Sequence, residues 1–265
     1  MSFRLNARAG EWALITGASS GLGAEFARAL ARRGYSLLLH GRNAERLEQL
    51  VIDLNKVRKL DCRVVIADLA REEGIDAVCQ AARQQAGLRL LVNNAGYGNP
   101  GLFQDVSVDS LLEMQRVHNE AVVRITHAAM AQLMQAEGAA VLNVSSVAAW
   151  LPGRGSVMYY ATKAFLNAFS RSLAADLSGT GVVVQALCPG FTHTGFHDPD
   201  KAAYLDKSKL PNWLWMEAAP VVEFSLRSLG NGRVIVIPGV VNRIFAWVGG
   251  HDWLYRKLVG NARRK

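Results

Sequence analysis

The stretch Thr16-Gly17-Ala18-Ser19-Ser20-Gly21-Leu22-Gly23 ends an apolar run at residues 12–16 and leads directly into a segment of helical period that starts at Ala24. Glycines lack a Cβ and let the backbone approach a pyrophosphate, while the N–H groups at the start of the helix face its negative charge. The turn therefore predicts a dinucleotide site, with the residues Gly17, Ser19, Ser20, Gly21, Leu22 and Gly23. The alternative is a tight strand-to-helix turn that needs glycine only for its backbone conformation.

Apolar runs of strand length alternate with longer segments of helical period along the chain. Seven runs are candidate strands, at residues 12–16, 35–40, 62–67, 89–93, 139–145, 181–187 and 233–237. Most are unbroken, as expected for parallel strands that helices cover on both faces. Apolar residues at helical spacing predict buried helix positions, namely Phe26, Leu30, Leu47, Leu50, Leu54, Val78, Ala82 and Leu112. No Pro/Gly/Ser-rich boundary interrupts the middle, so we expect one α/β domain over residues 1–265.

The distribution of charge limits the partners of the protein. Of the 265 residues, 50% are hydrophobic and 20% charged, as in a globular protein, and the net charge is +8. Residues 243–265 contain six basic side chains against Asp252, and Arg4 and Arg8 add two more. Because the body between is almost neutral, we expect no nucleic-acid binding. A membrane surface, an acidic partner or plain solvation of the tails stays open.

Cysteine usage and the lack of long apolar segments indicate the compartment. Cys62, Cys79 and Cys188 are odd in number and have no metal-ligand spacing, which predicts reduced thiols, no metal site and a cytoplasmic location. No signal-length apolar run opens the chain, and no later run reaches the roughly 20 residues of a membrane span. We expect a soluble protein, peripheral to a membrane at most.

Arg42 bears on the choice of cofactor. The second strand ends at His40-Gly41-Arg42-Asn43, where a site for NAD would place an acid against the adenosine ribose. No acid is there, and the charged planar fork of Arg42 suits a 2′-phosphate, so the sequence favours NADP(H) over NAD(H). The alternative is a solvated arginine at the start of the next helix.

Two further segments at strand ends could line a cofactor. Asp68, in Ile66-Ala67-Asp68-Leu69, could accept a hydrogen bond from an adenine amino group or could cap the following helix. Asn93-Asn94-Ala95-Gly96 closes the fourth strand, where amides and a glycine can bring a loop close to a cofactor or form a simple turn.

A tyrosine and a lysine share one helix face. Tyr159-Tyr160-Ala161-Thr162-Lys163 opens a helical segment that continues to about Leu177, and i,i+4 spacing places Tyr159 and Lys163 on the same side. A nearby ammonium group lowers the pKa of a phenol from its ordinary value of about 10. The pair can therefore exchange a proton with a carbonyl oxygen, although this spacing also arises by chance in many helices.

Ser146 and Asn119 could complete this site. Ser146 follows the fifth strand, at the carboxyl edge where such sheets bind ligands, and could donate to the same oxygen. Strand alternation turns Ser145 to the opposite side. Asn119 lies in mid-helix, where asparagine has a poor propensity and needs a partner such as an ordered water or Lys163, unless it is simply exposed.

One ordered set of motifs runs through residues 10–238: Thr16-Gly17-x-x-x-Gly21-x-Gly23, Asp68, Asn93-Asn94-Ala95-Gly96, Asn119, Ser146, Tyr159-x-x-x-Lys163 and Pro189-Gly190. In order and spacing this set resembles the short-chain dehydrogenase/reductase family. The resemblance implies a single Rossmann-type, doubly wound domain with about seven parallel strands flanked by helices. It also implies hydride transfer between a nicotinamide and a carbonyl or secondary alcohol carbon.

The resemblance assigns roles to individual residues. Tyr159 is implied to be the acid/base and Ser146 to polarise the carbonyl. Lys163 is implied to bind the nicotinamide ribose and lower the tyrosine pKa, and Asn119 to position a relay water. Further cofactor contacts are implied for Leu69, Asn94, Ala95, Gly96, Pro189, Gly190, Phe191 and Thr194. His193 and His197 are expected to be loop residues, since an acid/base group is already supplied.

The family's substrate pocket is closed by segments that here contain Tyr97, Trp150, Leu151, Phe196, Trp213, Leu214, Trp215 and Met216. Such an apolar lining favours a hydrophobic ketone or secondary alcohol. Residues 191–220 are expected to form a substrate lid, and the same aromatics could instead pack within this lid or form contacts in a homo-oligomer, a dimer or tetramer.

Residues 239–265 form a basic amphipathic extension. Its apolar stripe contains Val240, Val241, Ile244, Phe245 and Val248, and Trp253 follows among basic residues. We expect the stripe to be covered by the body, by a second subunit or by a membrane interface.

The whole chain could also be a non-catalytic dinucleotide-binding regulator or scaffold, but such a module has no need of a complete set of Asn119, Ser146, Tyr159 and Lys163.

Overall fold

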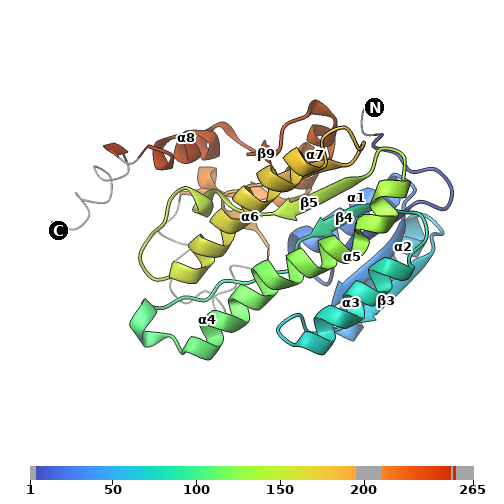
Figure 1. Cartoon of the computed structure of the whole chain (residues 1–265), viewed down its shortest axis with the longest axis horizontal. Coiled ribbons are helices and arrows are strands. Elements are labelled where there is room, and N and C mark those ends of the chain that lie inside the picture. The colour runs from blue at the N-terminus through green and yellow to red at the C-terminus, as the bar shows by residue number, and fades with distance from the viewer. Residues whose placement is uncertain (1–3, 195–210, 252, 255–265) are drawn as a thin grey trace.

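The computed structural model describes residues 4–194, 211–251, 253 and 254. In this part of the chain, seven parallel strands form one sheet in the spatial order β3-β2-β1-β4-β5-β6-β9 (Figure 1). Their bounds are β1 Trp12–Ile15, β2 Ser36–Gly41, β3 Cys62–Ile66, β4 Leu88–Asn93, β5 Ala140–Val144, β6 Val183–Leu187 and β9 Ile235–Val236. This confirms the predicted single Rossmann-type domain.

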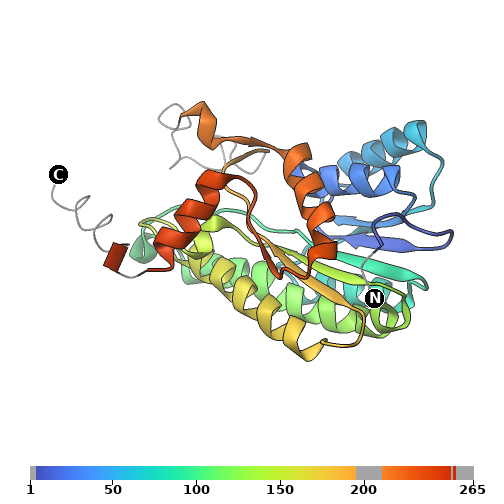
Figure 2. The same ribbon diagram turned by 90° about the horizontal axis from the view of Figure 1, so that it is seen from above.

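Helices cover both faces of the sheet, as Figure 2 shows from above. One layer contains α1 (Gly21–Arg32), α2 (Ala44–Val57) and α7 (Ala218–Ser228), whose apolar side chains share one core. The opposite layer contains α3 (Glu72–Gln84), α5 (Ala121–Gln135) and α6 (Val157–Asp176). The other helices of the described ranges are α4 (Val108–Gln115) and α8 (Val240–Gly249), the π turn η2 (Arg116–Glu120), and the short turns η1 (Phe103–Asp105), η3 (Val147–Ala149), η6 (Asn212–Leu214) and η7 (Leu229–Asn231).

Strand alternation explains why the strands read as unbroken apolar runs. In β1, Ala13 and Ile15 pack into the core under α1, α2 and α7, whereas Trp12 and Leu14 pack into the core under α3 and α5. Each central strand therefore needs apolar residues at successive positions. The edge strand β3 departs from this expectation, since Val64 and Ile66, which alternate with Val65 along the strand, remain exposed.

The predicted core positions on the helices are buried, with one exception. Phe26, Leu30, Leu47, Leu50, Leu54, Val78 and Ala82 all lie in the two cores. Leu112 is 54% exposed, so that prediction was wrong. It lies on α4, which buries Leu111 and Met114 instead.

The strand order places the ligand-binding edge. The chain turns back at β1, so that β2 and β4 lie on either side of it. The carboxyl ends of β1 and β4 therefore border the crevice where open α/β sheets bind ligands.

A two-stranded parallel sheet, β7 (Thr192–His193) with β8 (Met216–Glu217), was not expected from the sequence and lies after β6. None of the helices in the described ranges combines the length and hydropathy that a membrane span requires.

Candidate active site

The glycine-rich turn packs too tightly for side chains. Gly17 and Gly21 have φ of +67° and +56°, a region that favours glycine. A Cβ on Gly23 would lie 2.2 Å from the Gly17 carbonyl oxygen. Helix α1 starts at Gly21, and its N-cap Ser20 makes no side-chain capping bond. The first N–H groups of α1 therefore stay available to an anion such as a pyrophosphate, and the cradle fits the dinucleotide that the sequence predicts.

Asn94 holds this turn in place from the neighbouring strand. Its Nδ2 donates to the carbonyl oxygens of Thr16 (3.0 Å) and Gly17 (3.1 Å). The Ala95 N–H donates to Thr16 Oγ1 at 3.1 Å. The Asn94 side-chain amide is thus bonded to the protein's own backbone. The Asn94–Gly96 loop could therefore contribute to a cofactor site by passing close to the cofactor. Asn93 points into the sheet and donates to Thr126 Oγ1 and Asn143 Oδ1.

Arg42 and Asp68 lie together at the ends of β2 and β3. The Arg42 guanidinium is 3.9 Å from Asp68 Oδ1, and the side chain is 66% exposed. Asp68 Oδ1 also accepts the Ala70 N–H at 3.1 Å, so it does cap the following turn. An exposed ion pair of this length is weak. Arg42 can therefore leave Asp68 for a phosphate at little cost, while Leu69 beside it is buried.

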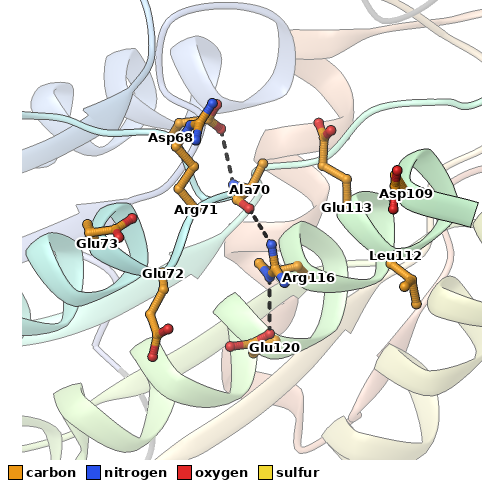
Figure 3. Close-up of a pocket in the computed structure, with 10 residues that line it drawn as sticks. All are labelled: Asp68, Ala70, Arg71, Glu72, Glu73, Asp109, Leu112, Glu113, Arg116 and Glu120. Atoms are coloured by element: carbon orange, nitrogen blue, oxygen red, sulfur yellow. Dashed lines mark hydrogen bonds and ion pairs between the residues drawn. The ribbon is translucent and has the colours of Figure 1, made fainter.

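A pocket of about 570 Å³ opens beside Asp68 (Figure 3). Arg116 crosses it, donating to the Ala70 carbonyl oxygen at 2.8 Å and lying 3.6 Å from Glu120. Six lining side chains are acidic and two are arginines; the lining consists of Asp68, Ala70, Arg71, Glu72, Glu73, Asp109, Leu112, Glu113, Arg116 and Glu120. The excess of carboxylates disfavours a phosphate here, so this pocket suits at most the uncharged adenine end of a nucleotide.

Tyr159 and Lys163 meet on α6 as the spacing predicts. The Lys163 Nζ lies 5.7 Å from the centre of the Tyr159 ring and donates to the Val144 carbonyl oxygen at 2.9 Å. Burial lowers the pKa of Lys163 to about 8. The Ser145 hydroxyl donates to the Lys163 carbonyl oxygen at 2.9 Å and so takes no part in the open site.

Ser146 follows β5 with its side chain at the start of η3. Its Oγ accepts the Ala148 N–H at 3.1 Å, an arrangement that leaves the hydroxyl proton for donation to a substrate oxygen. The Val147 N–H donates to the Pro189 carbonyl oxygen at 3.1 Å, which ties the ends of β5 and β6 together.

Asn119 and its neighbour His118 lie in the π turn η2, between α4 and α5. The Asn119 carboxamide oxygen is buried and accepts no hydrogen bond from the described residues, so it fits the expected role of binding a water. No hydrogen bond joins its side chain to Lys163 within the same ranges. His118 instead packs edge-on against the Tyr159 ring, with ring centres 6.0 Å apart. His118 has no distinguishing signal in the sequence, and only the mid-helix Asn119 beside it points to this turn.

The segment after β6 returns to the glycine-rich turn. A Cβ on Gly21 would lie 3.1 Å from Thr194 Cβ, so Thr194 lies directly against the predicted pyrophosphate cradle. A Cβ on Gly190 would lie 2.2 Å from Asn242 Oδ1, so α8 packs closely on the Pro189-Gly190 turn. The Phe191 carbonyl oxygen accepts the Met216 N–H at 2.9 Å, which fixes the base of the small β7–β8 sheet.

The side chains expected to line a substrate pocket are dispersed. Trp215 stacks on His193, with ring centres 4.9 Å apart, and tilts against Phe191. Trp213 is 66% exposed. Tyr97, Trp150, Leu151, Leu214 and Met216 are half-buried, and Phe196 and His197 lie outside the described residues. Trp215 thus packs against the segment after β6.

Taken together, the turn after β1 supplies an anion cradle, the end of β5 supplies a serine hydroxyl, and α6 supplies a half-buried phenol and a buried ammonium bonded to the last residue of β5. Such a set can bind a dinucleotide and move a proton to or from an oxygen atom beside it.

Comparison with known proteins identifies relatives of the whole domain. The family model for short chain dehydrogenases matches residues 11–204. The chain is 30% identical over 199 residues to the very-long-chain 3-oxoacyl-CoA reductase of Anas platyrhynchos, covering 74% of this chain and 64% of that protein. It is 29% identical over 215 residues to the inactive hydroxysteroid dehydrogenase-like protein 1 of Pongo abelii, covering 80% and 63%. The chain thus spans less than two thirds of the length of both relatives.

Two solved structures are similar over almost the whole chain. A short-chain dehydrogenase from Sphingobium yanoikuyae in complex with NADPH has 30% identity and a TM-score of 0.80, covering 96% of this chain and 94% of that one. A bulky-bulky ketone specific alcohol dehydrogenase from Comamonas testosteroni has 28% identity and a TM-score of 0.77, covering 96% and 92%.

Proposed function

The chain belongs to the short-chain dehydrogenase/reductase family of oxidoreductases, and on this premise we propose that it is an NADP(H)-dependent reductase of hydrophobic ketones, or the dehydrogenase of the matching secondary alcohols. The observation that carries the proposal is the placement of Lys163 against Tyr159, with the Lys163 Nζ bonded to the Val144 carbonyl oxygen at the carboxyl end of β5.

In the proposed reduction, bound NADPH would supply the hydride that the carbonyl carbon receives. Tyr159 gives its phenol proton to the carbonyl oxygen, and Ser146 donates a hydrogen bond to the same oxygen. The Lys163 ammonium stabilises the resulting phenolate and binds ribose hydroxyls. Asn119 holds a water through which Tyr159 and Lys163 regain a proton from solvent. One hydride and one proton are consumed for each alcohol formed, and no metal enters the reaction.

Cofactor contacts are proposed for the residues at the strand ends. The turn from Gly17 to Gly23, with Ser19, would hold the pyrophosphate, and Asp68 with Leu69 would border the adenine. Asn94, Ala95 and Gly96 would pass close beneath the cofactor, and Pro189, Gly190, Phe191 and Thr194 would close over its nicotinamide end. The contact between Thr194 and Gly21 supports this grouping, because it joins the first and last of these segments.

The preference for NADP(H) rests on Arg42, and replacing it tests the preference. We expect Arg42→Ala to weaken NADPH binding by roughly 10- to 100-fold, because charge-assisted hydrogen bonds to a phosphate contribute about 1.5–3 kcal/mol. NADH binding should change by less than about twofold, since its 2′-hydroxyl has no charge to lose. Fluorescence titration with each cofactor measures both constants. Arg46→Ala, in the first turn of α2, is the control. Equal weakening of both cofactors by Arg42→Ala would contradict the assignment.

The substrate class is proposed from the apolar composition of the segments after β4, β5 and β6, and the ketone specificity named for the Comamonas testosteroni enzyme supports it. A screen of hydrophobic ketones and alcohols with NADPH, NADP⁺, NADH and NAD⁺, followed by nicotinamide absorbance, tests substrate, direction and cofactor at once. Turnover of sugars but not of bulky apolar ketones would contradict the substrate class.

The second candidate function is a non-catalytic dinucleotide-binding regulator or scaffold. It is favoured by one observation, that a relative of similar identity bears the name of an inactive dehydrogenase-like protein. The complete tetrad of Asn119, Ser146, Tyr159 and Lys163 supports the enzyme instead. Tight NADPH binding without turnover of any ketone or alcohol in the screen would favour the regulator.

Helix α8 supports a proposal about partners. It packs on the body with its small residues, since Asn242 and Ala246 are buried and a Cβ on Gly249 would lie 2.1 Å from the Trp150 carbonyl oxygen. Its larger apolar residues Val240 and Ile244 are 61% and 53% exposed, and Trp247 is 60% exposed. With six basic residues in residues 243–265, this exposed face suits an anionic membrane interface. A cytoplasmic location and a homo-oligomer are proposed with it.

Point substitutions test this surface better than truncation. Removing α8 would also remove the contact between Asn242 and the Pro189-Gly190 turn. We expect V240S/I244S/W247S to abolish sedimentation with phosphatidylserine-containing vesicles, and neutral phosphatidylcholine vesicles to bind less of the wild-type protein. The pair V108S/L112S, also exposed but on α4, is the control. Vesicle binding that the triple substitution leaves unchanged would contradict the proposal, and loss of a dimer in light scattering would assign the face to a second copy.

A further inference from the structure

His118 is buried in the π turn η2, between α4 and α5. Its Nε2 accepts the Tyr97 N–H at 3.0 Å, and its Nδ1 lies 2.9 Å from Thr162 Oγ1. Thr162 Oγ1 in turn donates to the Tyr159 carbonyl oxygen at 3.0 Å. The imidazole ring also contacts two aromatic rings edge-on, Tyr97 at 5.7 Å and Tyr159 at 6.0 Å between centres.

These contacts fix the proton positions. Because the Tyr97 N–H donates to Nε2, that nitrogen carries no proton. A neutral ring then carries its proton on Nδ1 and donates it to Thr162 Oγ1, whose own proton goes to the Tyr159 carbonyl oxygen. These three hydrogen bonds form a series from the loop after β4 to α6, in which every donor has one acceptor. The direction of each hydrogen bond determines the direction of the next one.

We propose that His118 is a positioning residue, which joins the cofactor-side loop at Tyr97 to the backbone of Tyr159 and sets the phenol at its working distance from the nicotinamide. The proposal rests on the proposed function, because it assigns Tyr159 the proton transfer. The π turn is what allows it, since the wider turn brings a side chain from the junction of α4 and α5 against α6. A misplacement of a reacting group by about 1 Å costs roughly 100-fold in rate.

The surroundings keep the ring neutral. Burial lowers the pKa of His118 well below its usual value, and the nearby Lys163 ammonium lowers it further. A cationic ring would lose its acceptor for the Tyr97 N–H and would lie buried near a second cation. His118 therefore serves as a fixed donor and acceptor, with no proton exchange of its own.

Four variants, one control variant and one spectrum test the proposal. We expect His118→Leu and Thr162→Val each to lower kcat about tenfold or more, with the Kd for NADPH changed by less than about twofold. The double variant should be no slower than the slower single one, because both break the same chain. His118→Asn, whose side-chain nitrogen can replace Nδ1 as donor to Thr162, should recover most of kcat. Ser170→Ala is the matched control, since Ser170 is also a buried α6 hydroxyl that accepts from a side chain and donates to its own helix.

The spectrum separates this proposal from the proposed function. In nitrogen NMR of histidine-labelled protein, we expect His118 with an unprotonated Nε2 and a protonated Nδ1, unchanged between about pH 5 and 8. A wild-type protein that reduces no ketone would refute the proposed function. The spectrum would still show whether the hydrogen bonds from Tyr97 through His118 to Thr162 have the expected directions. The opposite tautomer, a titrating His118, multiplicative effects in the double variant, or a His118→Leu enzyme as fast as Ser170→Ala would overturn the positioning role.

Discussion

Tyr159→Phe is expected to lower kcat by about 10³-fold while NADPH still binds with nearly its wild-type Kd. The substitution removes only the hydroxyl, and general acid catalysis by one positioned group contributes about 10²–10⁴-fold. The phenyl ring keeps its contacts with the His118 ring and the Lys163 ammonium, so the shape of the site should be retained. Steady-state rates and fluorescence titration, measured on the same preparation, check the two halves of this prediction.

Tyr160→Phe supplies the matched control. It makes the same chemical change one residue further along α6, where the Tyr160 hydroxyl lies against Gly153. Turnover within about twofold of wild type is expected for this variant. If Tyr159→Phe turned over at a comparable rate, the assigned proton donor would be wrong. If it failed to bind NADPH, its loss of activity would say nothing specific about proton transfer, and the intact binding is therefore part of the prediction.

The fold could be predicted because its signals are local and repeated. Each central strand has apolar residues on both faces, so Trp12 to Ile15 reads as an unbroken run whatever its partners are. Each helix alternates buried and exposed residues at its own period. The edge strand β3 and the outer helix α4 are where this fails, since Val64, Ile66 and Leu112 are apolar without being covered by the domain.

The candidate site could be predicted only as far as residue types and strand ends allow. The Tyr159–Lys163 spacing gives one helix face, and the structure places the two side chains together as expected. The partners of Asn94, Asp68 and His118 depend on which loops meet across the sheet, and no sequence period encodes those meetings. The π turn is equally hidden, because one extra residue in a helix leaves the hydrophobic pattern on either side almost unchanged.

The buried Lys163 connects the chemistry of the site to the stability of the fold. Its ammonium is bonded to the neutral Val144 carbonyl oxygen, and no carboxylate forms an ion pair with it in the described ranges. The nearby Cys188 gives no counter-charge, because burial raises the pKa of its thiol to about 12. A buried cation without a counter-ion is costly, and the cost is retained where function needs the charge.

Lys163→Met is therefore expected to abolish turnover and to stabilise the protein in the absence of cofactor. Burial lowers the pKa of Lys163 from 10.5 to about 8, which corresponds to a cost of about 3 kcal/mol at pH 7. Loss of the hydrogen bond to Val144 offsets about 1 kcal/mol, so the net gain is about 2 kcal/mol, or roughly 5 °C in Tm. The loss of turnover should be at least about 100-fold.

The pH dependence of this gain tests its cause. The folded state disfavours the charged lysine, so the cost is fully present below about pH 8 and is lost as the pH rises toward 10.5, where the unfolded chain also releases its proton. The difference in Tm between Lys163→Met and wild type should therefore be largest near pH 7 and vanish before about pH 10.5. Lys56→Met, at an exposed lysine paired with Asp53, should show no such gain. A Lys163→Met protein less stable than wild type at both pH 7 and pH 10 would contradict this cause. It would mean that the ammonium is solvated or paired in solution, so that the charge beside the phenol does not destabilise the folded protein.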